Sequence, residues 1–204
     1  MEQDICVAPP KGRPREFCID EALAAALIVF WQRGYEGASM TELTAAMGIT
    51  KPSLYAAFGN KEALFHKALD LYEREKLAYM GAALDQPTAR GVAEKLLRGA
   101  LELQSSTSDP KGCLSVISSL ACSQESESIK ADVFARRESA RRAILARFEE
   151  AKQNGEFPDG LEPGALTNYL FALLQGFSVQ AGSGSTCADL CQLVETSMSV
   201  WPTR

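Results

Sequence analysis

Residues 38–62 read ASMTELTAAMGITKPSLYAAFGNKE, and this stretch decides the expected fold. Its pattern predicts two short helices, over residues 41–47 and 51–58, which Gly48 separates. Two helices joined by a short turn that contains glycine form a helix-turn-helix, whose second helix fits the major groove of DNA. Apolar residues at helical spacing are expected to pack beneath the pair: Leu43, Ala46, Ile49, Leu54 and Phe58.

The outer face of the second helix carries small, hydroxylic, basic or phenolic side chains. The candidates for reaching the groove are Thr50, Lys51, Ser53 and Tyr55. The alternative is the solvated face of an ordinary helical bundle, but the two-helix context favours DNA.

The amino-acid sequence of this region, and not only its pattern, is informative. The segment GITKPSLYAAFGNKEALF, preceded by GRPR at residues 12–15 and FWQRGYEGASM at residues 30–40, closely resembles the DNA-binding segment of the tetracycline-repressor (TetR) family of bacterial transcription regulators. The match covers roughly the first third of the chain. The rest resembles the family's ligand-binding and dimerisation domain in architecture only.

The resemblance implies an all-α fold in which an N-terminal three-helix helix-turn-helix domain precedes a larger C-terminal helical domain. We expect a flexible arm over residues 1–15, the DNA-binding domain over residues 16–62 and a ligand-binding and dimerisation domain over residues 63–204.

The resemblance also assigns roles to single residues. Tyr55 and Lys61 would contact phosphates, and Thr41 would present its hydroxyl and a helix N-terminus to another phosphate. The start of the second helix would reach base edges. Arg13 and Arg15 are either part of a basic arm in the adjacent minor groove or part of a disordered leader. The full candidate set is Arg13, Arg15, Thr41, Thr50, Lys51, Pro52, Ser53, Tyr55 and Lys61.

Composition and charge limit the class of protein to which the chain can belong. The 204 residues are rich in aliphatic helix formers, and the formal net charge is -5. An acidic chain binds DNA only where its cations gather, because local phosphate contacts release counterions. No run of about 18 uncharged apolar residues is present, so no membrane span is expected. The first 15 residues lack the pattern of a secretory signal, which indicates a cytoplasmic protein.

The six cysteines and the single histidine, His66, suggest no catalytic or metal centre. No CxxC pair occurs, so free thiols are expected. Cys187 and Cys191 share a helix face with apolar residues, which favours an interface core over metal binding or redox sensing. No nucleophile constellation or phosphate loop is present, so we expect no enzyme, no cofactor and no metal.

The remainder of the chain predicts further helices, with a continuous fourth helix from Lys61 past Tyr79. The penultimate helix, over about residues 165–181, is apolar almost all round and requires cover on every side. The simplest cover is a second copy of the chain. The family that the chain resembles dimerises through its last two helices.

Two polar residues, Gln104 and Arg137, interrupt apolar stripes. Either they are satisfied within the bundle, or they are the polar members of a small-molecule pocket. The expected lining of that pocket is Leu97, Leu101, Gln104, Ile117, Phe134, Arg137, Tyr169 and Phe177.

The sequence therefore predicts a homodimeric transcription regulator. We expect a repressor that leaves a pseudo-palindromic double-stranded DNA operator when a small, largely apolar effector binds. One alternative is a thiol- or metal-sensing regulator on the same scaffold. Another is a helical binding module or enzyme that retains the DNA-binding fold.

Overall fold

The computed structural model describes residues 18–120 and 126–202. Within these ranges every regular element is a helix, which confirms the all-α prediction. In chain order the helices are α1 (Ile19–Gly37), α2 (Met40–Met47), α3 (Lys51–Phe58), α4 (Lys61–Lys76), α5 (Ala78–Leu84), α6 (Ala89–Ser105), α7 (Leu114–Leu120), α8 (Glu127–Gln153), α9 (Pro163–Gly182) and α10 (Cys187–Ser199). The arm expected over residues 1–15, with Arg13 and Arg15, lies outside the described residues.

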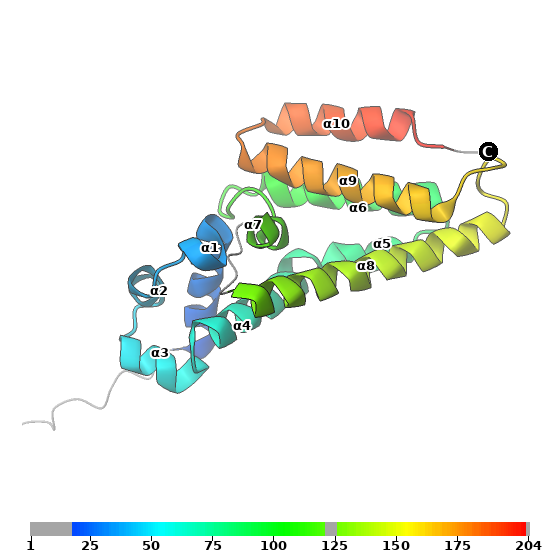
Figure 1. Cartoon of the computed structure of the whole chain (residues 1–204). Helices are drawn as coiled ribbons and strands as arrows, with labels where there is room; N and C mark the ends of the chain where they lie inside the picture. Colours follow the sequence, from blue (N-terminus) through cyan, green and yellow to red (C-terminus); the bar gives the residue numbers. More distant parts are fainter. Residues whose placement is uncertain (1–17, 121–125, 203–204) are drawn as a thin grey trace, which may run out of the picture.

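The helices form a small head and a longer body (Figure 1). The head consists of α1, α2, α3 and the first part of α4, and the body contains the remaining helices. The long helix α8 runs from the head to the far end of the body. In the body, α10 packs on α6 and α9, and α9 packs on α8.

Side-chain caps start the short helices of the head. Ser39 and Glu42 form a capping box at α2, and Asn60 caps α4 by accepting from the amide of Ala63 at 2.7 Å. Gly48 ends α2 in the left-handed region, with φ 66°, which glycine adopts without strain. These local signals place the turn of the helix-turn-helix where the sequence predicts it.

Two breaks shape the route from the head to the body. Helix α1 changes direction at Gly34, whose φ is 70°. The predicted continuous fourth helix is wrong in one respect, because the chain leaves helical geometry at Leu77, with φ -108° and ψ 8°, and α5 follows as a separate helix. No proline marks this break. Packing of α5 against α6 accompanies it, and Tyr79 then lies against Gly99 of α6.

The head and the body have separate apolar cores, and α6 and α8 contribute residues to both. The head core is built around Phe30, Trp31, Phe65 and Tyr72, and it also takes in residues from α7 and the start of α8. The indole of Trp31 donates to the carbonyl of Gly112 at 3.1 Å. The head is therefore packed directly against the segment that begins α7.

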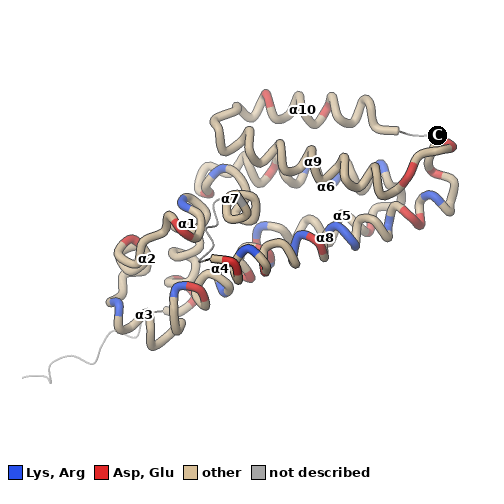
Figure 2. Tube along the Cα trace, viewed as in Figure 1, with Lys and Arg blue, Asp and Glu red and all other residues tan. Residues whose placement is uncertain are grey.

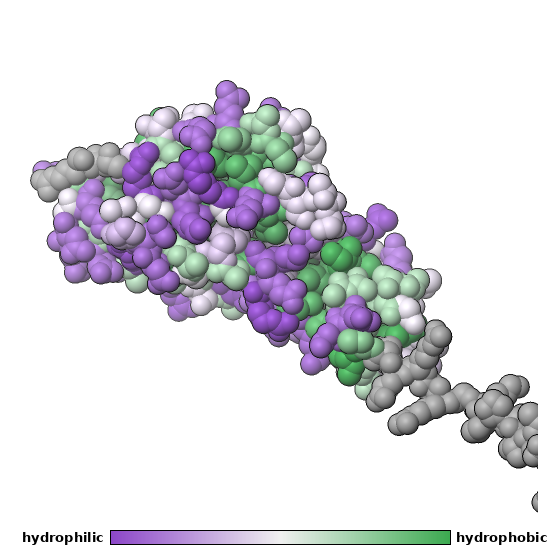
Figure 3. Space-filling model, turned by 180° about the vertical axis from the view of Figure 1, so that it is seen from behind, coloured by the Kyte–Doolittle hydropathy of each residue, from purple (hydrophilic) through white to green (hydrophobic). Residues whose placement is uncertain are grey.

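The surface is mixed in character. Seen from behind, hydrophilic side chains dominate and hydrophobic ones form smaller patches (Figure 3). None of the helices in the described ranges combines the length and the apolar character that a membrane crossing requires.

Candidate nucleic-acid interface and pocket

Helix α3 has one buried face and one open face. Leu54 and Phe58 are buried in the head core, whereas Lys51, Pro52 and Tyr55 are exposed, Tyr55 to 45%. The open face is thus the one that the sequence predicts, with exposed Ala56 beside it. Beneath α2 the expected packing differs, because Ala46 is exposed and Met47 is buried in its place.

Two of the candidate residues are engaged in capping α3. The Thr50 side chain accepts from the amide of Ser53 at 3.3 Å, and the two hydroxyl oxygens lie 2.8 Å apart. Thr41 is exposed in the first turn of α2. Thr50 and Ser53 therefore fix the start of α3, which leaves Lys51 and Tyr55 as its long, outward side chains.

The two candidate lysines lie over aromatic rings. The Lys51 ammonium is 6.0 Å from the centre of the Tyr55 ring, and the Lys61 ammonium is 4.6 Å from that of Tyr35. Burial lowers the pKa of Lys61, while the nearby Glu36 carboxylate acts in the opposite direction. Lys61 is thus half-buried at the start of α4, directly after α3.

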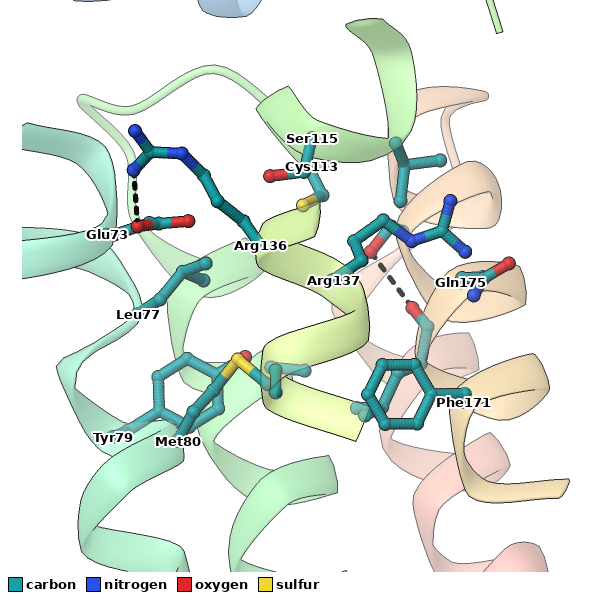
Figure 4. Close-up of a pocket in the computed structure, with 15 residues that line it drawn as sticks. Glu73, Leu77, Tyr79, Met80, Cys113, Ser115, Arg136, Arg137, Phe171 and Gln175 are labelled. Atoms are coloured by element: carbon teal, nitrogen blue, oxygen red, sulfur yellow. Dashed lines mark hydrogen bonds and ion pairs between the residues drawn. The ribbon is translucent and has the colours of Figure 1, made fainter. Parts of the chain in front are cut away.

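A cavity of about 110 Å³ opens in the body next to the head. Its walls come from α4, α5, α6, α7, α8 and α9, and from the residues at the break between α4 and α5 (Figure 4). The lining residues are Glu73, Leu77, Tyr79, Met80, Ala100, Cys113, Ser115, Val116, Arg136, Arg137, Ala140, Phe171, Leu174, Gln175 and Ser178. Most of them are apolar, so the cavity has the composition of a small-molecule site.

Two neighbouring arginines on α8 border the cavity and point to opposite sides of it. Arg136 turns toward Glu73 on α4, whereas Arg137 turns toward Gln175 on α9 (Figure 4). Arg136 pairs with Asp70 at 2.7 Å, with Glu73 at 2.8 Å and with Asp132 at 3.0 Å. Burial opposes its charge, but these carboxylates outweigh burial and raise the pKa of Arg136 above its usual value.

Asp132 continues this ion-pair cluster toward the head. Its second oxygen lies 2.8 Å from Nδ1 of His66 on α4. Burial acts to raise the pKa of Asp132, but the hydrogen bonds from Arg136 and His66 prevail and hold it below its ordinary value. The cluster ties α8 to α4 at two successive turns.

The structure does not bring the eight predicted pocket residues together, and of these only Arg137 lines the cavity. Leu97 and Phe177 are buried in the body core, and Leu101 packs against that core. Ile117 packs against the head core, and it borders a shallower groove between the head and α9. Tyr169 is 41% exposed, with its ring near Trp201.

Gln104 is a structural residue of the kind the alternative interpretation described. Its amide donates to the carbonyl of Gly112 at 3.0 Å and accepts from the amide of the same residue at 2.8 Å. These bonds fix the loop before α7 to α6. Gln104 is 3% exposed, so its polar atoms are satisfied inside the protein.

Phe134 on α8 does not face the interior, although the predicted pocket lining includes it. Ile129, Val133 and Ile144 are buried, while Phe134 is 65% exposed. The apolar periodicity of this charged helix is weak because arginines and alanines are interspersed along it. Phe134 instead borders an outer groove between α8 and α9, together with Arg137 and Phe171.

The residues that sequence reasoning missed lie where α4 breaks and where α9 faces inward. Tyr79 and Met80 follow the break, and Phe171, Leu174 and Gln175 form the inner face of α9. A signal in the sequence that could have indicated the packing of Tyr79 is Gly99, a glycine in the interior of a helix. A methyl group there would overlap the ring of Tyr79, so glycine permits this close packing.

Of the described cysteines, Cys187 and Cys191 lie one turn apart on α10, whereas Cys18 and Cys113 lie elsewhere in the fold. Cys18, Cys187 and Cys191 are exposed, and Cys113 is half-buried at the edge of the cavity. On α10 the predicted apolar face is buried at Leu190, Val194 and Met198. Cys187 and Cys191 of the same helix are exposed in the single chain. In the described ranges no three histidine, cysteine or acidic side chains gather as a metal site.

The outer face of helix α9 is uncharged. It carries no charged residue, and α10 carries few, whereas α8 is charged along its length (Figure 2). The large side chains Leu166, Leu170 and Phe177 are buried within the protomer. The exposed positions of α9 are small, polar or of moderate size and follow helical spacing: Ala165, Asn168, Tyr169, Ala172, Gly176, Val179, Gln180 and Gly182.

A capped helix-turn-helix joined to a helical body with its own cavity defines the class of helix-turn-helix transcription regulators. Comparison with known proteins narrows the class. The family described as "Bacterial regulatory proteins, tetR family" matches residues 22–68. The repressor ComR of Escherichia coli is 30% identical over 199 residues, which span 97% of this chain and 95% of ComR. The chain therefore belongs to the TetR family.

Two further relatives agree. The repressor BdcR of Escherichia coli is 27% identical over 182 residues, covering 88% of this chain and 87% of BdcR. A structure of the TetR family regulator CifR, a cysteine mutant complexed with a 26-base-pair operator DNA, superposes with a TM-score of 0.86. It is 39% identical and covers 93% of this chain and 100% of CifR.

Membership of the family settles the general activity. The chain is a DNA-binding transcription regulator and not an enzyme. Regulators of this family act as homodimers on double-stranded operator DNA and respond to small-molecule effectors.

Proposed function

We propose that this chain is a repressor whose homodimer inserts two copies of α3 into successive major grooves of a pseudo-palindromic operator. The observation that carries the proposal is the pairing of exposed Lys51 and Tyr55 with buried Leu54 on one capped helix. Such a helix holds its outward side chains in fixed positions, as reading base edges requires. Half-sites then lie about 34–36 Å apart or slightly more.

The contacts divide between phosphates and bases. Lys51 reaches base edges, while Tyr55 and Lys61 contact phosphates, as does Thr41 through its hydroxyl at the start of α2. Pro52 and its exposed neighbour Ala56 add an apolar surface of the kind that contacts thymine methyl groups. The remaining members of the set are Thr50 and Ser53, through the capped start of α3, and Arg13 and Arg15, through the arm.

The division of labour follows the domains. In this proposal residues 16–62 bind DNA and residues 63–204 bind the effector and the second subunit, while residues 1–15, the expected arm, lie outside the described part of the chain. The protein works in the cytoplasm, where its operator is. Support for repression comes from the relatives, since both ComR and BdcR are named transcriptional repressors.

The cavity beside α4 is the proposed effector site. Because α4 begins in the head and its far end lines the cavity, a ligand there bears on the orientation of the head. The ligand releases DNA only if it binds the non-operator arrangement more tightly than the operator arrangement. The metal-sensing alternative has no group of three histidine, cysteine or acidic side chains to support it in the described ranges.

Mapping the genomic sites bound by the purified protein tests the proposal. We expect a few strong sites that contain an inverted repeat. Fluorescence anisotropy on a duplex from such a site should then show tight binding that a scrambled duplex of the same composition does not compete away. Equal affinity for both duplexes would contradict sequence-specific regulation.

A further inference from the structure

We infer that the effector is a small apolar compound carrying one negatively charged oxygen group, and that Arg137 is its anchor. This inference rests on the proposed function, because it concerns the chemistry of the same cavity. Its basis is the distribution of charge and of unpaired polar groups around the cavity.

The carboxylates near the cavity are already committed. Glu73 pairs with Arg136, which also holds Asp70 and Asp132. Glu138, the acid that follows Arg137 in sequence, forms two hydrogen bonds of 2.8 Å with Arg141. Each of these acids is therefore paired with an arginine other than Arg137: Arg136 holds three of them, and Arg141 holds Glu138.

Arg137 is left without an acid. Its side chain forms no ion pair and no hydrogen bond in the described part of the chain, and it is half-buried at the cavity wall. A guanidinium presents its donors in a planar fork that matches a carboxylate with two parallel hydrogen bonds. A cation half removed from water and lacking a counter-charge is the natural position for an anionic group.

Two neutral polar side chains complete the polar end of the cavity. Gln175 on α9 lies beside Arg137, and Ser115 on α7 is buried at the cavity wall (Figure 4). Neither side chain has a hydrogen-bond partner in the described ranges. Unused donors next to an unpaired cation strengthen the case for an oxygen ligand, because buried polar groups are normally paired.

The rest of the lining selects an apolar body. Leu77, Tyr79, Met80, Ala100 and Leu174 contribute hydrocarbon and aromatic surface. The cavity of about 110 Å³ is slightly smaller than the roughly 150 Å³ of a buried cavity that admits benzene. It adjoins grooves that share Arg137 on one side and Met80 on the other. A ligand with a single ring therefore fits only if part of it, such as a short acidic chain, extends from the cavity into the adjoining groove at Arg137.

The test uses 3-phenylpropanoate as the probe and 3-phenylpropanamide, its neutral analogue, as the comparison. Binding to the full-length protein is measured by calorimetry, and release of the operator duplex is measured by anisotropy. We expect the acid to bind at least about tenfold more tightly than the amide, because a charge-assisted hydrogen bond is lost with the amide. The acid should also release DNA at lower concentration.

The decisive variant is Arg137→Gln, and the matched control is Arg142→Gln. Arg142 is exposed on the same helix and does not line the cavity. The ratio of the affinity for the acid to the affinity for the amide should fall toward one in Arg137→Gln and keep the parental value in Arg142→Gln. Both variants should bind the operator as the parent does.

The outcomes separate the two proposals. Equal binding of acid and amide by the parent, or an acid preference that survives in Arg137→Gln, would overturn the anchoring role of Arg137. Failure of either probe to bind the parent would overturn the assignment of ligand class and leave the operator assay unaffected. Failure of the parent to bind any operator would instead contradict the proposed function itself.

Discussion

Nη1 of Arg136 on α8 lies 2.8 Å from a carboxylate oxygen of Glu73 on α4, and both residues line the cavity. The contact joins the wall of the cavity, the proposed effector site, to the helix that completes the head core. Arg136 also binds Asp132, which in turn contacts His66 closer to the head. The cavity and the DNA-binding head thus share one chain of charged side chains.

Removing Arg136 should loosen this connection. In Arg136→Gln, Asp70, Glu73 and Asp132 lose their common cation, so we expect a loss of about 1–2 kcal/mol in the free energy of unfolding. Hydrogen exchange should become faster in peptides from α4. The matched control is Arg141→Gln, whose ion pair with Glu138 lies within α8 alone, and it should change stability much less because solvent screens that pair. Equal effects of the two variants would argue against a connecting role for Arg136.

Acid should weaken the same cluster through Asp132. Because its pKa is lower in the folded protein than in the unfolded chain, Asp132 stabilises the fold above its unfolded pKa of about 3.9, and the contribution is lost as pH falls through the folded value. Asp132→Asn should therefore be less stable than the parent at pH 7, and the difference should shrink below about pH 4. Urea unfolding from pH 7 to pH 3 measures this. Asp85→Asn, at an exposed position, should show no such convergence.

A methyl group added at Gly99 should disturb the cavity by displacing Tyr79, which lines it. The added atom would overlap the Tyr79 ring, which must then move, and overpacking of this kind costs about 1–3 kcal/mol. Gly81→Ala, at an open helical position, should be neutral or stabilising. Thermal unfolding compares the two variants. The double variant Gly99→Ala with Tyr79→Ala should lose less stability than the sum of the single changes, and strict additivity would refute the contact.

The dimer should depend on the uncharged outer face of α9. A Cβ at Gly176 meets nothing within 4 Å in the protomer, so Gly176→Arg should leave the fold intact. It should nevertheless separate the subunits, since it places an unpaired charge in an apolar interface. Sedimentation velocity should show a monomer whose circular dichroism matches the parent. Gly81→Arg serves as the control and should remain dimeric. A Gly176→Arg dimer of parental strength would place the interface elsewhere.

The head was predictable because its signals are local. Ser39, Thr50 and Asn60 each cap the helix that follows, and Gly48 fixes the turn, so a few neighbouring residues determine the arrangement. Burial within α3 also follows directly from helical spacing. Only the choice of Met47 over Ala46 depended on how α2 rests on the core.

The cavity was not predictable in the same way, because its walls come from helices far apart in sequence. Its position depends on the break at Leu77 and on how α8 packs against α4 and α9, which exposes Phe134 and leaves Arg137 at the cavity wall. Neither feature has a local signature. Apolar spacing identified Leu97 and Phe177 as inward-facing, but the core of the body and the lining of a cavity share that property.

The central claim is that α3 binds the operator through Lys51 and Tyr55, and the salt dependence of operator binding tests it most directly. Anisotropy titrations across a range of salt concentrations should show that Lys51→Ala binds about tenfold or more weakly, with a salt slope lower by about one, because one cation leaves the interface. Tyr55→Phe should weaken binding without changing the slope, since the lost phenol is neutral. Lys152→Ala, at the far end of α8, should match the parent in both respects. Parental affinity and slope in Lys51→Ala, together with parental affinity in Tyr55→Phe, would contradict the account.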